Sequence, residues 1–439
     1  MGKSSKSFKI ITLGCKVNQY ESVYFNETFT GAGWHQARVD EPGDVVVVNT
    51  CVVTQKAAHQ SRQAIRKAIR ENPCGCVAAV GCYAQTAPGE LAEIAGLGLI
   101  ADNRMKMEVP GSLIKGRSSA RMTVLLREYE PCTPFDSFEI RSFPGRARAY
   151  LKIQDGCQSF CTYCIVPFTR GPYRSLAPER VLHMLKVLSE QGFMEVVLTG
   201  IHLGMYGVDL GEGSDLVSLL RMVGREGLPL RIRLSSIEPN EIKPELIAMA
   251  ASERWLCRHF HIPLQSGDGR ILKMMRRKYD APDFAALIES LHSAIPDVCI
   301  GVDVMSGFPG EDSGAHRNTL SLVRDLPLSY LHVFPFSPRP GTVAEKLKGR
   351  VDPGIIKERA AELRGIGRKK RDLFYRSCLG KEFQVIGEGR DPEAPGLMKG
   401  RSDNYLPVLY PPGQRGEGEP VQVILHGIQG GRLRGSVLD

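Results

Sequence analysis

Apolar residues in the first hundred positions come in short runs separated by segments with helical spacing. The continuous runs predict buried strands at residues 8–13, 45–48 and 77–80. Helical periodicity follows two of these runs, around residues 18–30 and 55–70. Strands that alternate with helices are typical of a parallel sheet. We therefore predict a small α/β domain at residues 1–115.

The pattern becomes irregular between residues 116 and 144 and then resumes. Pro, Gly, Ser and Arg clusters predict a linker or hairpin in the irregular segment. Beyond it, six further strands are predicted, at residues 150–154, 195–198, 230–234, 260–264, 299–304 and 331–334. Helical patterns separate them, as at residues 178–191, where Pro178 begins the helix and Gly192 follows it. Six βα units in residues 145–375 predict a barrel or partial barrel, whose chemistry belongs on the loops after the strands.

The last part of the chain changes character again. Residues 354–376 predict a helix with a basic run at Arg364, Arg368, Lys369, Lys370 and Arg371. Short strands such as residues 382–386 and 421–425, separated by Gly and Pro turns, predict a small β-barrel at residues 376–439. The predicted fold class is α/β: a parallel-sheet domain, a partial (β/α)6 barrel and a terminal β-barrel.

The composition bears on where the protein is located and on what it binds. No apolar run reaches the roughly 18 residues that a membrane span needs, and the amino-terminal residues do not form an apolar signal region. We expect a cytoplasmic protein with no membrane contact, in which 12 cysteines favour metal or redox chemistry over disulfides. A net charge of +9 favours a polyanionic partner only weakly.

Three cysteines lie in one loop directly after the first predicted barrel strand. Cys157, Cys161 and Cys164 place three thiolates within eight residues. Three ligands hold three corners of a cubane iron–sulfur cluster and leave one iron open to a small molecule. The alternative is a zinc clip closed by Cys132 or a histidine, which the barrel context disfavours.

Three more cysteines follow the three predicted strands of the first domain. Cys15, Cys51 and Cys82 would lie at the carboxyl edge of one sheet, where open α/β folds bind ligands, and could share a cofactor. Isolated cysteines are also often buried as small apolar residues, and Cys74 and Cys76 lie close to Cys82 in sequence.

The loop with Cys157, Cys161 and Cys164, and aromatic Tyr163 before its last cysteine, resembles the radical S-adenosylmethionine (SAM) signature. The resemblance implies a [4Fe–4S] cluster whose open iron chelates SAM and cleaves it to a 5′-deoxyadenosyl radical. Tyr163 is a candidate to orient the adenine. Polar residues at the predicted strand ends are candidates to hold SAM, or are turn and cap residues: Thr199, Gly200, Ser235, Glu238 and Gln265.

A wider resemblance, to the methylthiotransferases, covers nearly the whole chain. The matching segments are residues 12–21, 49–51, 81–85, 157–171, 233–239, 261–267, 303–311 and 334–341. This family pairs a three-cysteine domain with a radical SAM domain and ends in a TRAM domain. The resemblance implies a second [4Fe–4S] cluster on Cys15, Cys51 and Cys82 that presents sulfur to the substrate carbon, and a second SAM that methylates it.

Residues 14–21 resemble the branch of the family that acts on N6-threonylcarbamoyladenosine beside the tRNA anticodon. The resemblance implies tRNA, SAM and an electron donor of flavodoxin or ferredoxin type as partners. Isopentenyladenosine in tRNA and an aspartate of a ribosomal protein are alternative substrates. A nonenzymatic iron–sulfur or zinc protein that binds RNA is the alternative class. Residues 376–439 hold eight basic and eight acidic residues, so RNA contacts would depend on the basic helix before them.

Overall fold

A computed structural model describes residues 6–116, 122–130, 133–413 and 416–438. Cys132, considered above as a zinc ligand, lies outside these residues. Contacts divide the chain into two units. Unit 1 comprises Met1–Ser142, Gln154–Arg174 and Ser337–Glu345, and unit 2 comprises Phe143–Ile153, Ser175–Phe336 and Lys346–Asp439.

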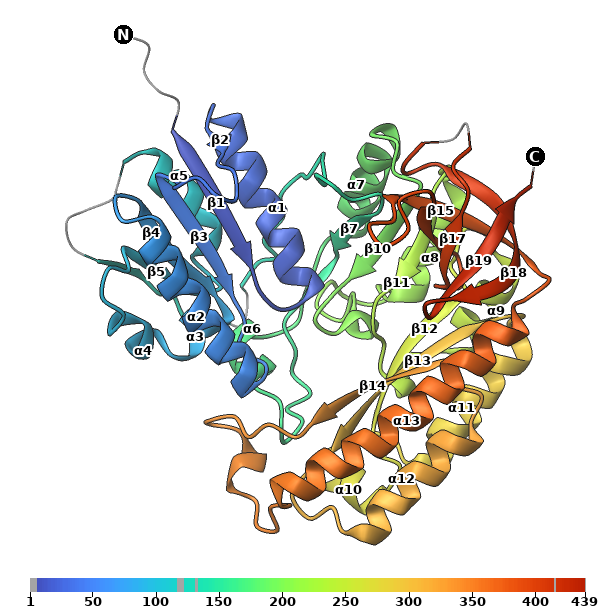
Figure 1. Cartoon of the computed structure of the whole chain (residues 1–439). Coiled ribbons are helices and arrows are strands. Elements are labelled where there is room, and N and C mark those ends of the chain that lie inside the picture. Colours follow the sequence, from blue (N-terminus) through green and yellow to red (C-terminus); the bar gives the residue numbers. More distant parts are fainter. Residues whose placement is uncertain (1–5, 117–121, 131–132, 414–415, 439) are drawn as a thin grey trace. The chain divides into compact units, whose positions relative to one another are not determined.

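The centre of unit 1 is a six-stranded sheet in the order β2-β1-β3-β4-β5-β6, with every neighbouring pair parallel (Figure 1). Its strands are β1 (Ser7–Thr12), β2 (His35–Gln36), β3 (Val45–Thr50), β4 (Cys76–Gly81), β5 (Leu99–Ala101) and β6 (Thr123–Leu125). All six residues of β3 are buried, because helices cover both faces of a parallel sheet. The predicted α/β domain is therefore confirmed as a parallel sheet.

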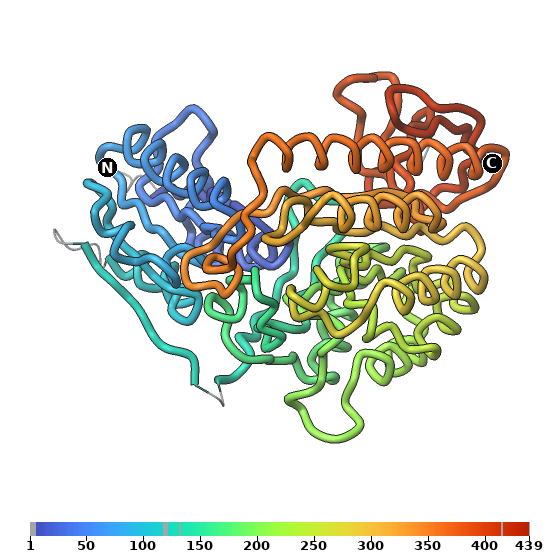
Figure 2. The backbone as a smooth tube through the Cα atoms, turned by 90° about the horizontal axis from the view of Figure 1, so that it is seen from below, coloured from blue at the N-terminus to red at the C-terminus, as the bar shows by residue number. Residues whose placement is uncertain are grey.

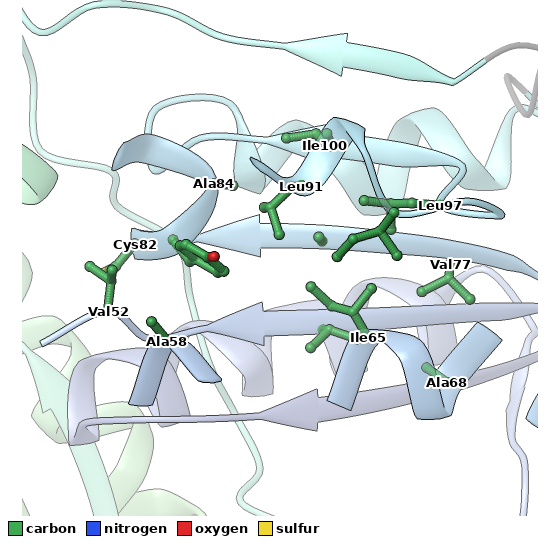
Figure 3. Packing of buried hydrophobic residues seen from close by; sticks show 14 of the residues in the cluster. Val52, Ala58, Ile65, Ala68, Val77, Cys82, Ala84, Leu91, Leu97 and Ile100 are labelled. Carbon is green, nitrogen blue, oxygen red and sulfur yellow. The ribbon is translucent and has the colours of Figure 1, made fainter. Parts of the chain in front are cut away.

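Helices pack on both faces of this sheet. They are α1 (Lys16–Gly31), α2 (Gln55–Glu71), α3 (Cys82–Thr86), α4 (Pro88–Ala92), η1 (Lys106–Glu108) and α5 (Val109–Ile114), followed later in the chain by α6 (Val166–Arg170). On one face, Ile65 and Ala68 of α2 pack against the sheet (Figure 3). On the other, Phe25 and Phe29 of α1 do so. Thr54 caps α2 by accepting a hydrogen bond from the Ala57 amide.

The segment interpreted as a linker or hairpin contains a strand of the sheet. Residues Thr123–Leu125 form β6, which pairs in parallel with β5. Three residues are too few to display a period of two, and their side chains are at least partly exposed, so the apolar pattern gave no signal.

Unit 2 contains all six predicted barrel strands, in two three-stranded parallel sheets of order β11-β10-β7 and β12-β13-β14. The strands are β7 (Ala149–Lys152), β10 (Glu195–Thr199), β11 (Arg231–Leu234), β12 (His259–Gln265), β13 (Cys299–Ser306) and β14 (Tyr330–Pro335). A bridge between Ile232 and Leu256 lies between the two sheets. The strands follow one another in chain order, as a partial barrel requires.

Helices follow these strands. They are α7 (Pro178–Glu190), η2 (Leu203–Met205), α8 (Leu216–Arg225), η3 (Pro239–Glu241), α9 (Pro244–Ser252), α10 (Gly269–Met274), α11 (Ala281–Ala294), α12 (Ser313–Asp325) and α13 (Pro353–Ser377). The beginning of α11 shows how the sequence fixes a boundary. Asp280 and Asp283 form a reciprocal capping box, with proline in the first turn. Within the part of the chain that the structure describes, no helix combines the length and apolar character of a membrane span.

A closed five-stranded barrel ends unit 2, in the order β15-β16-β17-β19-β18. Its strands are β15 (Glu382–Arg390), β16 (Met398–Ser402), β17 (Pro407–Tyr410), β18 (Pro420–Gln429) and β19 (Arg432–Val437). The long helix α13 contacts β14 and α12 and leads into this barrel (Figure 2). The predicted fold class, with a terminal β-barrel, is confirmed.

Further short elements are β8 (Gln154–Asp155), β9 (Arg174–Ser175) and η4 (Val343–Lys346).

Candidate functional site

Three cysteines of unit 1 follow three adjacent strands of its sheet. Cys15 precedes α1 after β1, Cys51 follows β3 directly, and Cys82 follows β4 as the first residue of α3. They lie close enough together for their charges to interact. Burial raises the pKa of the Cys51 thiol to about 11, and the neighbouring Cys82 and Cys15 contribute to the shift. The three side chains that the sequence placed at one sheet edge therefore share one locality.

Two glycines allow these loops to approach one another. Gly14 has φ +93°, and a Cβ atom there would lie 2.8 Å from both Cβ and Sγ of Cys51. Gly81 has φ +94°, and a Cβ atom there would lie 2.6 Å from the Asn49 side-chain oxygen. Any larger residue would push the cysteine loops apart. The arrangement fits a compact group held by three thiolates, as an iron–sulfur cluster with one open iron requires.

A buried ion network lies beside these cysteines. The Arg170 guanidinium donates to Glu21 Oε1 at 2.7 Å and to Asn18 Oδ1 at 2.5 Å. The Lys106 ammonium group donates to Glu21 Oε2 at 2.5 Å. Glu21, Arg170 and Lys106 are each 1% exposed or less. Burial works against the charge on Arg170, but Cys82 and Glu21 outweigh it and hold its pKa well above the usual value.

Asn103 joins this network to the cysteine edge. Its side-chain amide lies 3.6 Å from the sulfur of Cys82 and donates to the Thr169 carbonyl at 2.7 Å. Its oxygen accepts from Lys106 at 2.7 Å. Sequence reasoning missed these residues. Glu21 and Arg170 lie within the segments that resemble the methylthiotransferases, residues 12–21 and 157–171. Their charge, however, predicted exposed rather than buried side chains.

The second cysteine group, also in unit 1, occupies the loop between β8 and α6. The ends of this loop are tied, because the Cys157 amide donates to the Gly171 carbonyl at 3.0 Å. Gly171 has φ +69°, and a Cβ atom there would lie 2.4 Å from the Tyr129 ring. Cys157, Cys161 and Cys164 are all half-buried.

Helix α6 links the two cysteine groups inside unit 1. It begins two residues after Cys164 and ends at Arg170, and it contacts α3, which begins with Cys82. Ile165 packs in the same core cluster as Cys82. The chain therefore supports both cysteine groups with one packed set of helices.

The proposed SAM-contacting residues fall into different units. Tyr163 is a half-buried residue of unit 1, whereas the other five belong to unit 2. Ser235, directly after β11, is buried and its hydroxyl has no hydrogen-bond partner within the described residues. Such an orphaned hydroxyl suits a ligand. Thr199 is buried at the end of β10, with Gly200 next to it.

The remaining two candidates at the strand ends differ from each other. Gln265 ends β12 with φ +62°, an uncommon conformation for a residue with a side chain. Burial raises the pKa of the Glu238 carboxyl, which is paired with Arg277 in the structure. Glu238 is thus already partnered, a feature that the sequence did not reveal.

The predicted basic run on α13 does not form one surface. Arg364, Arg368 and Lys369 are exposed, whereas Lys370 and Arg371 are half-buried. The Lys370 ammonium group donates to the carbonyls of Arg324 and Leu326 at 2.5 Å. Three exposed basic residues therefore remain for a polyanion.

Two family models match separate parts of this chain. Residues 7–100 match the model "Uncharacterized protein family UPF0004", and residues 151–323 match the model of the Radical SAM superfamily. A threonylcarbamoyladenosine tRNA methylthiotransferase of Bacillus subtilis is 35% identical over 401 residues, which cover 91% of this chain and 89% of the relative. One of the same name from Aquifex aeolicus is 38% identical, covering 86% and 92%. A tRNA-2-methylthio-N(6)-dimethylallyladenosine synthase of Moorella thermoacetica is 32% identical over the full length of both.

Among solved structures, a radical SAM methyltransferase of Kitasatospora setae, with tryptophan substrate and a SAM analogue bound, has a TM-score of 0.56 at 16% identity. The match covers 75% of this chain and 73% of that one. At this identity the likeness shows the fold alone.

Proposed function

Because this chain belongs to the radical SAM methylthiotransferase family, we propose that it converts N6-threonylcarbamoyladenosine beside the tRNA anticodon to its 2-methylthio derivative. The observation that carries the substrate is the name shared by the relatives from Bacillus subtilis and Aquifex aeolicus, at 35% and 38% identity. Dimethylallyladenosine in tRNA is the second candidate, since relatives at 30–32% identity carry that name.

Radical SAM membership implies one [4Fe–4S] cluster and SAM, and a second cluster is part of the proposal. We place the SAM-cleaving cluster on Cys157, Cys161 and Cys164, and the second on Cys15, Cys51 and Cys82. When bound, these groups supply a 5′-deoxyadenosyl radical and a sulfur atom. The convergence of the three strand-end cysteines, with two glycines at the approach of their loops, supports the second site.

The protein's own residues position these groups and balance their charge. The tie between Cys157 and Gly171 fixes the loop that presents three thiolates. Arg170 keeps a buried positive charge beside the strand-end cysteines, where it offsets the negative charge of thiolates. Ser235 offers an unpaired hydroxyl to SAM. SAM cleavage requires an electron, which a low-potential donor of flavodoxin or ferredoxin type would supply. A tRNA substrate supports a cytoplasmic location.

Iron and sulfide analysis after anaerobic reconstitution tests the two-cluster part of the proposal. The wild type should hold about eight iron atoms per chain, and the Cys15/Cys51/Cys82→Ala variant about four. A matched Cys74/Cys76→Ala variant should keep the full amount, because it removes neighbouring thiols outside the proposed site. Equal iron in the wild type and the Cys15/Cys51/Cys82→Ala variant would exclude the second cluster.

Nucleoside mass spectrometry tests the substrate. Transfer RNA from cells that lack the gene should contain unmodified N6-threonylcarbamoyladenosine, and its 2-methylthio form should return with the wild-type gene but not with Cys161→Ala. Recovery of 2-methylthio-isopentenyladenosine instead would favour the second candidate. Absence of 5′-deoxyadenosine from reduced, reconstituted protein supplied with SAM would favour a nonenzymatic RNA-binding protein.

A further inference from the structure

Three ionisable side chains meet on one face of the sheet β12-β13-β14 in unit 2. The strands are parallel neighbours, and Asp303 of β13 is in register with Pro263 of β12 and with His332 of β14. His261 lies two residues before Pro263, so it projects to the same side of the pleated sheet as Asp303. Three adjacent strands thus contribute one side chain each to a single point.

The two separations from the carboxylate in this cluster are those of atoms that share a metal ion. His261 Nε2 lies 2.9 Å and His332 Nδ1 lies 3.5 Å from the same carboxylate oxygen, Oδ1 of Asp303. All three ligand atoms lie within 4.8 Å of one another. Metal–ligand bonds of about 2.0–2.2 Å place neighbouring ligand atoms roughly 3.0–3.5 Å apart. Asp303 Oδ1 is buried, and no donor within the described residues makes a well-aligned hydrogen bond to it.

Hydrogen bonds behind the cluster set the ring orientation of His261. Its Nδ1 lies 3.1 Å from the Tyr330 hydroxyl oxygen, and the same hydroxyl lies 2.9 Å from Nε2 of His259. If His261 donates from Nδ1 and Tyr330 donates to His259, the Nε2 lone pair of His261 faces Asp303 Oδ1. In that tautomer, a cation that both atoms coordinate removes the repulsion between the lone pair and the carboxylate oxygen at 2.9 Å. Ligating histidines commonly use their second ring nitrogen in this way.

We propose that His261, Asp303 and His332 form a mononuclear site for a divalent transition-metal ion. Two imidazoles and one carboxylate suit manganese, iron(II) or zinc, and the three ligands leave further positions for water or another oxygen ligand. The His332 side chain is 55% exposed, whereas those of His261 and Asp303 are 14% and 22% exposed. The site is therefore open on the side of His332. It uses no cysteine and is independent of the proposed substrate.

Manganese binding to the reconstituted holoenzyme tests the site. The six-line electron paramagnetic resonance signal of free Mn²⁺ at room temperature reports the unbound ion, and cysteines that already hold clusters do not compete for it. We expect about one Mn²⁺ per chain, and Zn²⁺ should displace it because nitrogen ligands favour zinc. His332→Ala should weaken binding at least tenfold without unfolding the protein, since that side chain is exposed.

Control variants separate metal binding at these three side chains from metal binding elsewhere on the protein. Asp303→Asn should also abolish Mn²⁺ binding, whereas His292→Ala, which removes an exposed histidine of α11, should leave it unchanged. Mn²⁺ binding of undiminished affinity in both His332→Ala and Asp303→Asn would overturn the proposal. So would the absence of both Mn²⁺ and Zn²⁺ binding by the wild type.

Discussion

In each unit, a buried glutamate lies among several cations, but these cations have different further partners. In unit 1, Glu21 holds Arg170 and Lys106, and Arg170 lies beside cysteine sulfurs. In unit 2, Glu195 is fully buried and accepts from Arg231 and Arg233, each through a contact of 2.7 Å.

The free arms of the two unit 2 arginines continue into the terminal β-barrel. Arg231 donates to the carbonyls of Gln384 and Arg401, and Arg233 donates to those of Ser402 and Asp403. These carbonyls belong to β15, β16 and the turn after β16. The Glu195 network therefore joins the partial barrel to the β-barrel.

The comparison teaches that a buried carboxylate can serve chemistry in one place and architecture in another. A buried ion pair costs desolvation, so its retention calls for a use other than simple stability. Beside the strand-end cysteines, the Arg170 charge would act on the cluster that we propose they hold. Between two β-structures, the Glu195 charge orients guanidinium groups that satisfy backbone carbonyls. Substitutions should separate the two roles.

The largest expected effect is on the activity of Arg170→Met. Loss of the charge beside the strand-end cysteines should lower methylthiolation roughly 100-fold. Reductive SAM cleavage should change only a few-fold, and the midpoint potential of the proposed strand-end cluster should fall, because a nearby positive charge favours the reduced form. Measurements are product formation by mass spectrometry and redox titration followed by electron paramagnetic resonance. The Glu21→Gln/Arg170→Met double variant also removes the carboxylate that Arg170 pairs with; recovery of activity in it would contradict the electrostatic role.

Second in size is the stability of unit 2 in Glu195→Gln. Removing a buried partner charge should destabilise the unit by about 3–5 kcal/mol. The chain has two tryptophans, one in each unit, so Trp255 fluorescence in a Trp34→Phe background reports unit 2 during urea unfolding. The iron content of folded protein should not change. Loss of iron without loss of stability would reverse the assignment of roles.

A smaller effect is expected from pH. Burial opposes the charge of Glu195, but Arg233 and Arg231 outweigh it and hold the carboxyl pKa well below its ordinary value of 4.5. A depressed pKa contributes stability that is present above the ordinary value and is lost as pH falls through the folded-state pKa. The difference in the free energy of unfolding between wild type and Glu195→Gln should be constant from pH 7 to 5. It should become smaller below pH 4.5. Urea midpoints from Trp255 fluorescence test this, and a constant difference at pH 3.5 would contradict it.

The smallest effect is expected for an exposed pair. Lys67 and Glu71 lie one turn apart on α2 at 3.7 Å, with side chains 65% and 53% exposed. Glu71→Gln should change the stability of unit 1 by less than about 0.5 kcal/mol. Trp34 fluorescence in a Trp255→Phe background measures it. A change above about 1 kcal/mol would show that solvent exposure does not separate this pair from the buried networks.

Sequence patterns predicted the longer strands of the parallel sheets and the positions of the cysteines because both are local, and they missed the short strands β2, β5 and β6. Apolar runs fix where strands end; Cys51 and Cys82 follow such ends directly, and Cys15 follows β1 after two residues. The ion pair of Glu21 and Arg170 joins residues 149 positions apart, and no period connects them. The predicted basic run on α13 is only partly exposed for a similar reason, because Lys370 donates to the Arg324 carbonyl of α12. Long-range polar contacts were thus the unpredictable part of the site.

Unit 1 is assembled from three separate stretches of chain, and this has a consequence for synthesis. Its last stretch begins at Ser337, which accepts from the Gln55 amide, and Ala344 donates to the Thr162 carbonyl between the clustered cysteines. A ribosome adding roughly 5–20 residues per second delivers Ser337 about 15–65 s after Cys15. Cys164 precedes Ser337 by about 9–35 s at the same rate, so the contacts of this last stretch with Gln55 and Thr162 form only when most of the chain has been made.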